Sequence, residues 1–404
     1  MAKNIINNNS ATTIDILTPG DEWLVLRDVL IRTEGDGIHG IHETSVASGS
    51  RIQVNGFVAS DGNGAFALYS QGADSAVTIG KSGVLTSTAT ALRAEGSGAD
   101  IHNLGRISGT SEAVSMSGEQ QTLTNSGVIG SYDAVKVTGG FNTIINEKSG
   151  IIDGYHSSGT AGSGIVVLLS AAGETTKIVN RGEISGSAYA VYGEIGNESV
   201  INRGLITGFV FLGDGADRFD NRKGTMDGLA DAGQGDDLYI LDDTQTDIRE
   251  QFNFGRDTVK TSVNHTLDDN FEVLILTGGK DINGVGNALA NDVVGNRGAN
   301  TLRGEGGADS LAGGKGNDRL FGGLDSDVFV FGTGDGHDTI TDFQNGLDQI
   351  GVGSWKAIRN AQDLIDNHAR DTGAGLLIEA GNDRVLLKGF LKSDLDASDI
   401  TFMV

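Results

Sequence analysis

Short apolar runs alternate with Asn and Gly at a regular interval over the first half of the chain. The repeated motif is an apolar pair, an Asn, a short link, a Gly, an apolar residue and a second Gly. Its clearest copies contain Asn103, Asn125, Asn146, Asn180 and Asn202, spaced 22, 21, 34 and 22 residues apart. We interpret the long step as one coil with an insertion around residues 156–164. A fixed period of this kind indicates a repeat architecture.

Each repeat also holds a second short apolar segment, such as Ala113-Val114, Ala134-Val135 or Ala190-Val191. Two or three alternating runs per 21 to 25 residues, separated by Gly and Asn, predict a parallel β-helix over residues 1–212. We expect it to be right-handed, with Asn side chains bonded from coil to coil through their amides. The alternative is an up-and-down β-sandwich, which would lack the fixed coil length.

A second, shorter repeat begins after about residue 212. Its glycines fall nine residues apart, and an apolar residue follows each one in the same register, as at Leu302, Leu311 and Leu320. The best units are residues 304–312, 313–321 and 322–330, each with Asp at its sixth position. Isolated copies end at Asp217 and Asp237. The change of period predicts a second solenoid that is built differently from the first.

These units resemble the calcium-binding nonapeptide of RTX (repeats-in-toxin) proteins, and the likeness covers roughly residues 210–404. The resemblance implies a parallel β-roll in which two units complete one coil, so that each turn stacks on the second turn after it. Residues 213–345 are then the RTX β-roll with its spacer. Residues 346–404 resemble the serralysin-type C-terminal region, which is a cap and a type I secretion signal. The predicted fold is all-β, a right-handed parallel β-helix followed by an RTX parallel β-roll.

The resemblance also implies which residues bind calcium. Carbonyls of the turns and the sixth-position Asp converge between stacked turns, and a set of oxygen ligands favours calcium over zinc. Turn 295–300 is expected to share an ion with turn 313–318, and turn 304–309 with turn 322–327. Turns ending in Asn291 and Asn300 are expected to hold weaker sites. The predicted ligands of several Ca2+ ions are Asn296, Gly298, Asn300, Glu305, Gly307, Asp309, Gly313, Gly314, Gly316, Asp318, Gly322, Gly323, Asp325, Asp327, Asp338, Asp217 and Asp237.

Calcium is also expected to fold the second half of the chain. Without an ion the stacked carboxylates would repel one another, and the glycine-rich turns carry too little apolar side chain to offset their ordering. When no site exists before folding, the free energies of metal binding and folding merge.

Charge and composition narrow the possible partners. The formal charge is −25, from 54 acids against 29 Lys and Arg, and 34 of the acids lie in residues 211–404. This balance argues against nucleic acid or an anionic membrane as a partner, because both would repel it. Absent Cys excludes disulfides and thiolate sites. Residues 1–10 contain no apolar run typical of a signal peptide, and the longest apolar run, 165–169, is too short for membrane insertion.

Enzyme activity is expected to be absent, although a β-helix joined to RTX modules is similar to mannuronan epimerases and polysaccharide lyases. Their chemistry needs a base, a uronate-neutralising group and an acid on one face. No Asp-Pro-His, His-Glu-x-x-His or Gly-x-Ser-x-Gly motif occurs. His39 and His42 are expected to be exposed strand residues, while Tyr155 and His156 are a second candidate pair. No catalytic residue is predicted.

The sequence therefore predicts a secreted, extracellular or cell-surface calcium-binding protein with a structural or adhesive role in the bacterial surface layer or extracellular matrix. The resemblance implies export by type I secretion machinery. The expected partner is either another copy of the chain, in a homo-oligomer or filament, or an acidic polysaccharide. Arg106, Arg181 and Arg203 occupy comparable positions in their repeats and serve either such a polysaccharide or nearby carboxylates. The alternative is a uronate lyase or epimerase with an RTX module.

Overall fold

The structure is a computed structural model that describes residues 2–154, 161–169, 171–252 and 254–403. Two compact units divide the chain. The first comprises Met1–Asp237 with Thr246–Ile248, and the second comprises Leu238–Gln245 with Arg249–Val404. Residues 213–237, which carry the two isolated nonapeptide copies, therefore pack with the β-helical repeats.

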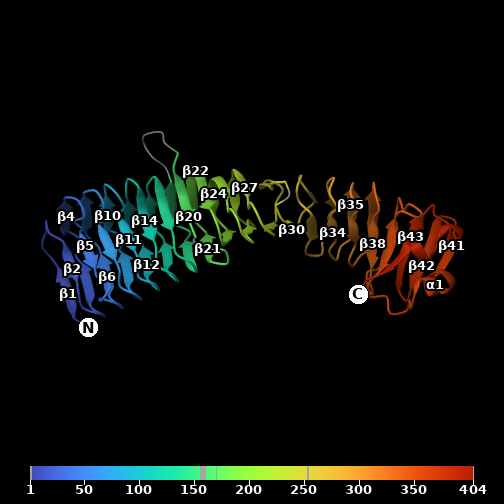
Figure 1. Cartoon of the computed structure of the whole chain (residues 1–404), viewed down its shortest axis with the longest axis horizontal. Helices are drawn as coiled ribbons and strands as arrows, with labels where there is room; N and C mark the ends of the chain where they lie inside the picture. The colour runs from blue at the N-terminus through green and yellow to red at the C-terminus, as the bar shows by residue number, and fades with distance from the viewer. Residues whose placement is uncertain (1, 155–160, 170, 253, 404) are drawn as a thin grey trace. The chain divides into compact units, whose positions relative to one another are not determined.

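Three parallel strands make up each coil of the first unit, and equivalent strands of successive coils pair side by side (Figure 1). The first stack consists of β1 (Lys3–Ile6), β3 (Glu22–Val25), β6 (Arg51–Val54), β9 (Ala76–Ile79), β12 (Asp100–Asn103), β15 (Thr122–Asn125), β18 (Asn142–Asn146), β21 (Thr175–Asn180), β23 (Asn197–Asn202) and β25 (Arg218–Asp220).

The other two faces share long strands toward the end of the unit. The second stack consists of β4 (Leu30–Glu34), β7 (Phe57–Asp61), β10 (Val84–Ser87), β13 (Arg106–Ser108), β16 (Val128–Gly130), β19 (Ile151–Gly154), β22 (Glu183–Gly193), β24 (Leu205–Phe211) and β26 (Thr225–Asp227). The third consists of β2 (Ile14–Ile16), β5 (Ile41–Glu43), β8 (Leu68–Ser70), β11 (Leu92–Ala94), β14 (Glu112–Met116), β17 (Asp133–Val137), β20 (Ser163–Val167), the second halves of β22 and β24, and β27 (Leu229–Asp231). The predicted parallel β-helix is confirmed.

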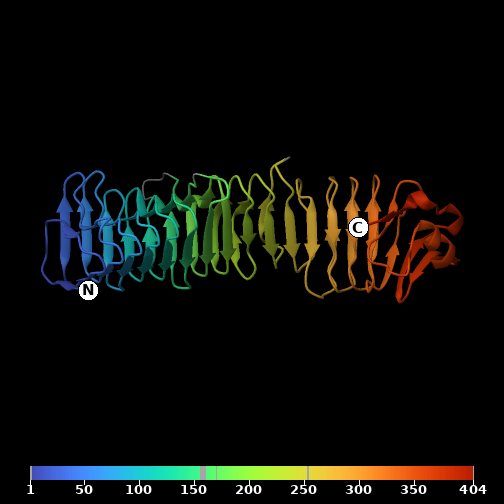
Figure 2. The same ribbon diagram turned by 60° about the horizontal axis from the view of Figure 1, so that its bottom comes forward.

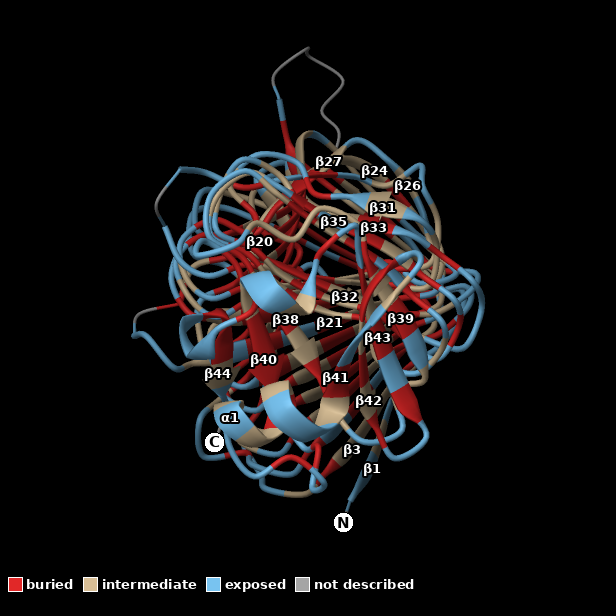
Figure 3. Cartoon of the chain, turned by 90° about the vertical axis from the view of Figure 1, so that its right-hand side faces the viewer, coloured by how far each residue is buried: buried red, intermediate tan, exposed pale blue. Residues whose placement is uncertain are grey.

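The core of the first unit is a set of apolar columns. Alternate residues of a strand point to opposite faces, so one apolar residue of each short strand points inward. In the first stack Ile101, Leu123, Ile144, Ile178 and Val200 lie opposite one another and are fully buried. Buried and intermediate residues alternate along these strands. Figure 3 colours the chain by burial and shows exposed loops around the buried strand residues.

An unbroken ladder of Asn side chains runs up the β-helix. Each Nδ2 donates to the Oδ1 of the next coil's Asn, and all members are fully buried. The donor–acceptor distances between successive members are 2.8 Å for Asn103–Asn125, 2.9 Å for Asn125–Asn146, 2.9 Å for Asn146–Asn180, 2.9 Å for Asn180–Asn202 and 2.7 Å for Asn202–Asn221. Asn146 lies directly opposite Asn180, so one coil contains the 34-residue step that the sequence indicated.

Replacing an internal rung is expected to destabilise the first unit more than replacing an end rung. Asn146→Ala removes the acceptor of Asn125 and the donor to Asn180, and a buried polar group left without a partner costs about 1–3 kcal/mol. Asn103→Ala, the matched control, removes one bond of the ladder, the donor to Asn125, together with the bonds of Asn103 to Val128 O and from Gly105 N. Denaturant unfolding of the two variants measures the difference, and equal losses would contradict a role for the ladder.

The second unit is a two-sided roll. Its strands alternate between two stacks, as Figure 2 shows for the parallel rows of this unit. One stack consists of β28 (Leu238–Leu241), β30 (Thr258–Thr261), β32 (Val273–Leu276), β34 (Asp292–Val294), β36 (Ser310–Ala312), β38 (Val328–Phe331), β40 (Gln349–Val352) and β44 (Ile400–Phe402). The other consists of β31 (His265–Thr266), β33 (Gly284–Val285), β35 (Thr301–Glu305), β37 (Arg319–Gly323), β39 (His337–Ile340) and β43 (Asp383–Lys388).

Pairing in the nonapeptide array advances by 18 residues, since Asp292 lies opposite Ser310 and Ser310 opposite Val328. Two nonapeptides therefore complete one coil, and the predicted β-roll is confirmed. The sixth-position residues of alternate units consequently lie one above another.

The C-terminal residues continue both stacks of the roll. An antiparallel meander of β41 (Ala369–Thr372), β42 (Gly375–Ala380) and β43 adds to β39, and β44 adds to β40. Short helical turns connect these strands: α1 (Ala361–Asp363), the π-helical η1 (Leu364–His368), and the 3-10 turns η2 (Lys392–Asp394) and η3 (Ala397–Asp399). The meander covers the strand edge of the last coil, as a cap does.

Candidate calcium sites

Three sixth-position Asp side chains are buried in the stacked turns of the nonapeptide array. In each, Oδ1 accepts a hydrogen bond from a backbone N–H of the preceding coil. The bonds join Asn291 N to Asp309 at 2.7 Å, Asn300 N to Asp318 at 2.7 Å and Asp309 N to Asp327 at 3.0 Å. This bond holds each carboxylate inside the roll and fixes its orientation.

The second oxygen of each carboxylate has no hydrogen-bond partner among the described residues. Oδ2 of Asp309, Asp318 and Asp327 is buried and accepts no hydrogen bond. An ionised oxygen in this position is costly unless a cation compensates it. The roll therefore presents anionic oxygens that its own polar groups do not satisfy.

Burial also changes the protonation of these Asp residues. Desolvation raises the pKa of Asp309 and Asp318 to about 7 and that of Asp327 to about 6, and neighbouring Asp residues add to the rise. The backbone hydrogen bond to each carboxylate opposes the shift. In the absence of metal, a proton is the alternative way to remove the charge near neutral pH.

The first glycine of each unit leaves space for the carboxylate that closes it. An added Cβ would lie 2.0 Å from Asp309 Oδ2 at Gly304, 2.4 Å from Asp318 Oδ2 at Gly313, and 2.1 Å from Asp327 Oδ2 at Gly322. Any side chain at these glycines would displace the carboxylate. The nine-residue glycine spacing is therefore a requirement of the site.

Backbone carbonyls supply further oxygens between the turns. A Cβ on Gly314, Gly316 or Gly323 would lie 2.6, 2.4 and 2.3 Å from the carbonyl oxygens of Asn296, Gly298 and Glu305, respectively. The three glycines have positive φ, as does Gly307. Carbonyl and carboxylate oxygens, with no nitrogen or sulfur donor, fit a hard cation of the calcium type.

Asn residues close the turns at the start of the array in a different way. Asn300 Oδ1 accepts from Asn296 N at 2.8 Å, and its Nδ2 donates to the carbonyl of Ile282 at 2.6 Å. Asn291 repeats the pattern, with Nδ2 donating to the carbonyl of Phe271 at 2.9 Å. An amide can satisfy this corner without an ion because it both donates and accepts, whereas a carboxylate only accepts. Calcium ligation by the Asn300 side chain stays a prediction.

The two further Asp residues that the sequence singled out in the roll have different positions. Asp338 is buried, and its Oδ1 accepts from Asp318 N at 2.9 Å, so it continues the column of sixth-position residues. Burial raises its pKa to about 8, with Asp318 contributing. Asp325 instead lies at the exposed surface with φ +72°, and its Oδ2 accepts from Gly307 N at 3.3 Å.

Sequence reasoning missed Asp348, which is buried and accepts from Asp327 N at 3.1 Å through Oδ1. Its Oδ2 accepts from Gln344 N at 2.8 Å. The step of 21 residues from Asp327 departs from the nonapeptide spacing, so the period does not identify it. A signal is nevertheless present in the sequence. Asp327 follows Asp309 two turns later, Asp338 follows Asp318 in the same way, and Asp348 follows Asp327.

The isolated copies in the first unit use the same geometry. Asp217 N donates to Asp237 Oδ1 at 2.7 Å, and both side chains are buried. Desolvation raises the pKa of Asp217 to about 8 and that of Asp237 to about 6. Their predicted calcium ligation remains a prediction.

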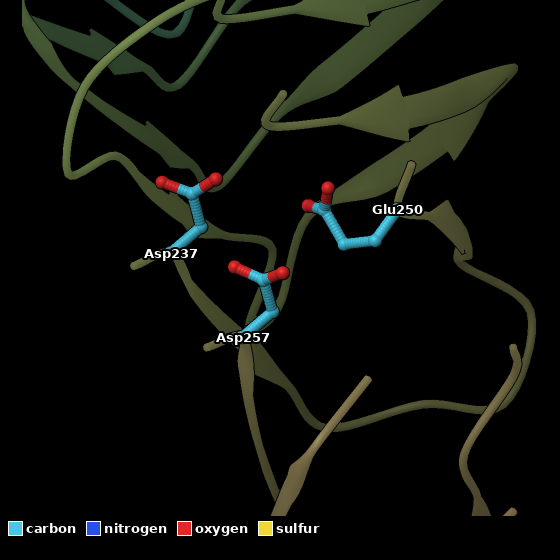
Figure 4. Close-up of side chains that lie close together, drawn as sticks. All are labelled: Asp237, Glu250 and Asp257. Atoms are coloured by element: carbon cyan, nitrogen blue, oxygen red, sulfur yellow. The ribbon is translucent and has the colours of Figure 1, made fainter. Parts of the chain in front are cut away.

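Buried acids that the sequence did not indicate also occur in the second unit. Figure 4 draws Glu250 and Asp257 of this unit, with Asp237 of the first unit. Glu250 accepts a hydrogen bond from the Tyr239 hydroxyl, and Asp257 N donates to Glu272 Oε2 at 2.8 Å. Asp257 lies in the register of the sixth-position column, because the residues that follow Asp257, Glu272 and Asn291 pair with one another, although it belongs to no complete nonapeptide.

The three Arg residues that formed a candidate polysaccharide surface do not form one column. Arg106 pairs with Val128, Val128 with Ile151, and Ile151 with Glu183, so Arg106 and Glu183 belong to one column. Arg181 lies outside this column, directly after the end of β21. Arg203 contacts the buried Asp220 at 2.9 Å, and Arg181 contacts Glu147 at 3.1 Å. Arg181 and Arg203 therefore balance nearby carboxylates. The second candidate enzyme pair, Tyr155 and His156, lies outside the described residues.

A family model for the RTX calcium-binding nonapeptide repeat (4 copies) matches residues 285–320, 294–329 and 304–340. No curated protein matches the chain. Among the described residues, no helix has the length and apolar character needed to cross a bilayer. The matched stretch contains Asp309, Asp318 and Asp327 with their glycine turns, and repeats of this kind bind calcium. The second unit thus carries an array of RTX calcium-binding nonapeptide repeats.

Proposed function

We propose that this chain is a secreted calcium-binding structural or adhesive protein of the bacterial surface or extracellular matrix. The observation that carries the proposal is the set of buried carboxylates of Asp309, Asp318 and Asp327, whose second oxygens have no hydrogen-bond partner among the residues that the structure describes. Proteins with RTX repeats are typically secreted, and type I secretion machinery is the export route that fits them. Scarce calcium inside the cell then leaves the roll unfolded, and calcium outside folds it.

Self-association is the proposed way in which the protein builds a surface or matrix. Among the described residues, β1 pairs with β3 on one side and has no strand partner on the other. An unpaired strand edge is a template for pairing with another chain. The apolar side chains of Ile5 and Leu17 are exposed in the same first coils.

Addition of calcium to the EDTA-treated full chain is expected to produce species larger than the monomer. Light scattering follows their size, and negative-stain microscopy shows whether they are filaments. Magnesium at equal ionic strength is the control for screening of the −25 charge. A chain that folds with calcium but stays monomeric at high concentration would exclude self-assembly and leave adhesion to a glycan.

The alternative, a uronate lyase or epimerase, has one candidate location on the third stack. His42 stacks on Tyr69 with ring centroids 5.2 Å apart, and the Tyr69 hydroxyl donates to Glu95 Oε2 at 2.6 Å. Arg93 contacts Glu95 at 2.8 Å. His39 lies beside both rings. The expectation that the two His are simply exposed strand residues is therefore wrong, because aromatic side chains of the next coil half-bury them.

This cluster favours binding over catalysis. Both ring nitrogens of His42 have partners, Asp15 at 3.2 Å and Gln71 at 3.1 Å, so neither is free to take a sugar proton. Burial and Glu95 raise the pKa of Tyr69 to about 12, which disfavours a phenolate base. Absorbance of unsaturated products from uronate polymers, or epimerisation followed by NMR, would establish the enzyme instead.

A further inference from the structure

One corner of the β-helical coil is filled by a column of buried polar side chains. Asn142 lies opposite Thr176, and Thr176 lies opposite Glu198. Backbone N–H groups join further members, from Gln121 to Asn142 Oδ1 at 2.7 Å and from Glu198 to Asp217 Oδ1 at 2.5 Å. The column therefore runs through successive coils of the first unit with the same geometry as the sixth-position column of the roll.

The early members of this corner column are amides that fill the corner by donating hydrogen bonds. Gln121 Nε2 donates to the carbonyls of Ala94 at 3.1 Å and Gly96 at 2.8 Å. Asn142 Nδ2 donates to the carbonyls of Gly118 at 3.0 Å and Gly139 at 2.7 Å. The corner thus points backbone carbonyl oxygens toward the side chain that occupies it.

After Asn142 the column continues with Thr176, whose Oγ1 has no hydrogen-bond partner among the described residues, and then with the acids Glu198 and Asp217. An ionised carboxylate cannot donate a hydrogen bond as the amides of the earlier coils do. Glu198 is 1% exposed, and neither carboxylate oxygen has a hydrogen-bond partner among the described residues. Oδ2 of Asp217, which is 2% exposed, is likewise without a partner there. The two residues, joined by the bond from Glu198 N to Asp217 Oδ1, therefore hold three buried oxygens that accept no hydrogen bond from the described residues.

The surrounding turn leaves room for these oxygens. The carboxylate of Glu198 faces two glycines of its own turn. A Cβ on Gly193 would be 3.1 Å from Glu198 Oε2, and a Cβ on Gly196 would be 3.2 Å from Glu198 Oε1. The same position at Gly196 also lies 2.5 Å from Leu169 Cδ1 and 3.1 Å from the carbonyl oxygen of Glu174, so one side of the turn is apolar. Gly196 has φ +133°, a conformation that favours glycine.

The electrostatics of the pair agree with a need for a positive charge. Desolvation, followed by the charge of Asp217, raises the pKa of Glu198 to about 9. Desolvation likewise raises the pKa of Asp217 to about 8, and nearby Asp237 and Asp214 add to the shift. Charged groups at this depth are paired or bind metals, or else they take up protons.

We propose that Glu198 and Asp217 bind a divalent cation, calcium, inside the β-helical unit and outside the nonapeptide array. Their carboxylates and the corner carbonyls form an oxygen-only set of the kind that calcium prefers. The sequence predicts Asp217 as a calcium ligand, and the geometry adds Glu198 from the preceding coil, whose turn has Gly at the first and fourth positions of a nonapeptide but Glu in place of Asp at the sixth. Calcium consequently stabilises the last coils of the first unit in addition to the roll.

Hydrogen exchange of the full chain tests the proposal, with peptides from residues 193–220 compared in calcium and in EDTA. We expect calcium to slow exchange there by about tenfold or more, since an ion bound only by the folded coil stabilises it. Glu198→Gln is expected to abolish this difference and leave the protection of residues 304–340 intact. The variant should fold, because Gln121 occupies the same corner in an earlier coil.

Glu183→Gln is the matched control, because it removes an exposed charge from the same unit and is expected to behave as the wild type. Metal analysis after dialysis should count one calcium fewer per chain in Glu198→Gln, and also in Asp217→Asn. Equal counts, or exchange in residues 193–220 that ignores calcium while residues 304–340 respond, would overturn the site. These readouts do not depend on assembly, so they separate this inference from the proposed function.

Discussion

Removal of calcium from the full chain with EDTA is expected to unfold the β-roll of the second unit, while the Asn-ladder coils of the first unit keep their β structure. The reason is that Asp309, Asp318 and Asp327 each bury an oxygen that has no hydrogen-bond partner in the described part of the chain. Each ion bound only by the folded chain stabilises it by about 2.7 kcal/mol when free calcium is 100 times the dissociation constant. Loss of several ions therefore removes more free energy than the whole free energy of unfolding expected for a roll of this size.

The pH dependence of the calcium-free roll follows from the raised pKa values. Asp309 and Asp318 have a pKa of about 7 when folded against an ordinary value of 3.8, so the folded state binds more protons. The contribution of these two Asp residues to the stability of the metal-free roll is therefore complete below pH 3.8. It is lost as the pH rises through their folded-state pKa of about 7. With calcium the trend reverses, because metal and protons compete for the same oxygens.

Circular dichroism and hydrogen exchange measure both effects, in EDTA and in calcium, at pH values from 5 to 8. The expected result is that calcium protects residues 304–340 strongly at pH 8 and weakly at pH 5. Protection of this segment in EDTA at pH 8 would contradict the central role of calcium. Salt at matched ionic strength controls for general charge screening.

Asp318→Ala is expected to have a large effect on calcium-dependent folding of the array. Asp318 receives the N–H of Asn300, and its own N–H donates to Asp338, so it connects three coils. The substitution removes the anionic oxygen that faces Gly313 and leaves the N–H of Asn300 without its acceptor. We expect the calcium concentration needed for folding to rise by at least about tenfold, equivalent to about 1.4 kcal/mol.

A calcium titration followed by circular dichroism gives the midpoint for each variant. Asp394→Asn is the matched control, since it removes one exposed carboxylate from the same unit away from the turns. Asp318→Asn separates the two roles of the residue. The amide is expected to restore the N–H acceptor, as Asn300 does in its own turn, without restoring the anionic ligand. A midpoint equal to wild type in Asp318→Ala would exclude this carboxylate as a ligand.

Much of the fold follows from the sequence because solenoids place each residue above its equivalent one period earlier. The spacing of Asn103, Asn125 and Asn146 therefore predicts both the coil and the ladder, including the amide bonds between coils. The nine-residue spacing predicts in the same way that Asp309 and Asp327 meet in stacked turns. For these features the period alone determines which side chains become neighbours.

Tertiary structure decided the features that do not repeat. The turn of Glu198 keeps two glycines at the nonapeptide spacing but lacks the Asp and the second glycine, and it joins Asp217 because a coil of 19 residues stacks their turns. His42 and Tyr69 meet because residues 27 apart pair at that point, a step that differs from the Asn period. The burial of Asp348 and Glu250 depends on spacer and closing strands of irregular length. The sequence by itself determined the periodic architecture and the positions of the sixth-position Asp residues, and only the stacking of unequal coils decided which unrepeated acids are buried together.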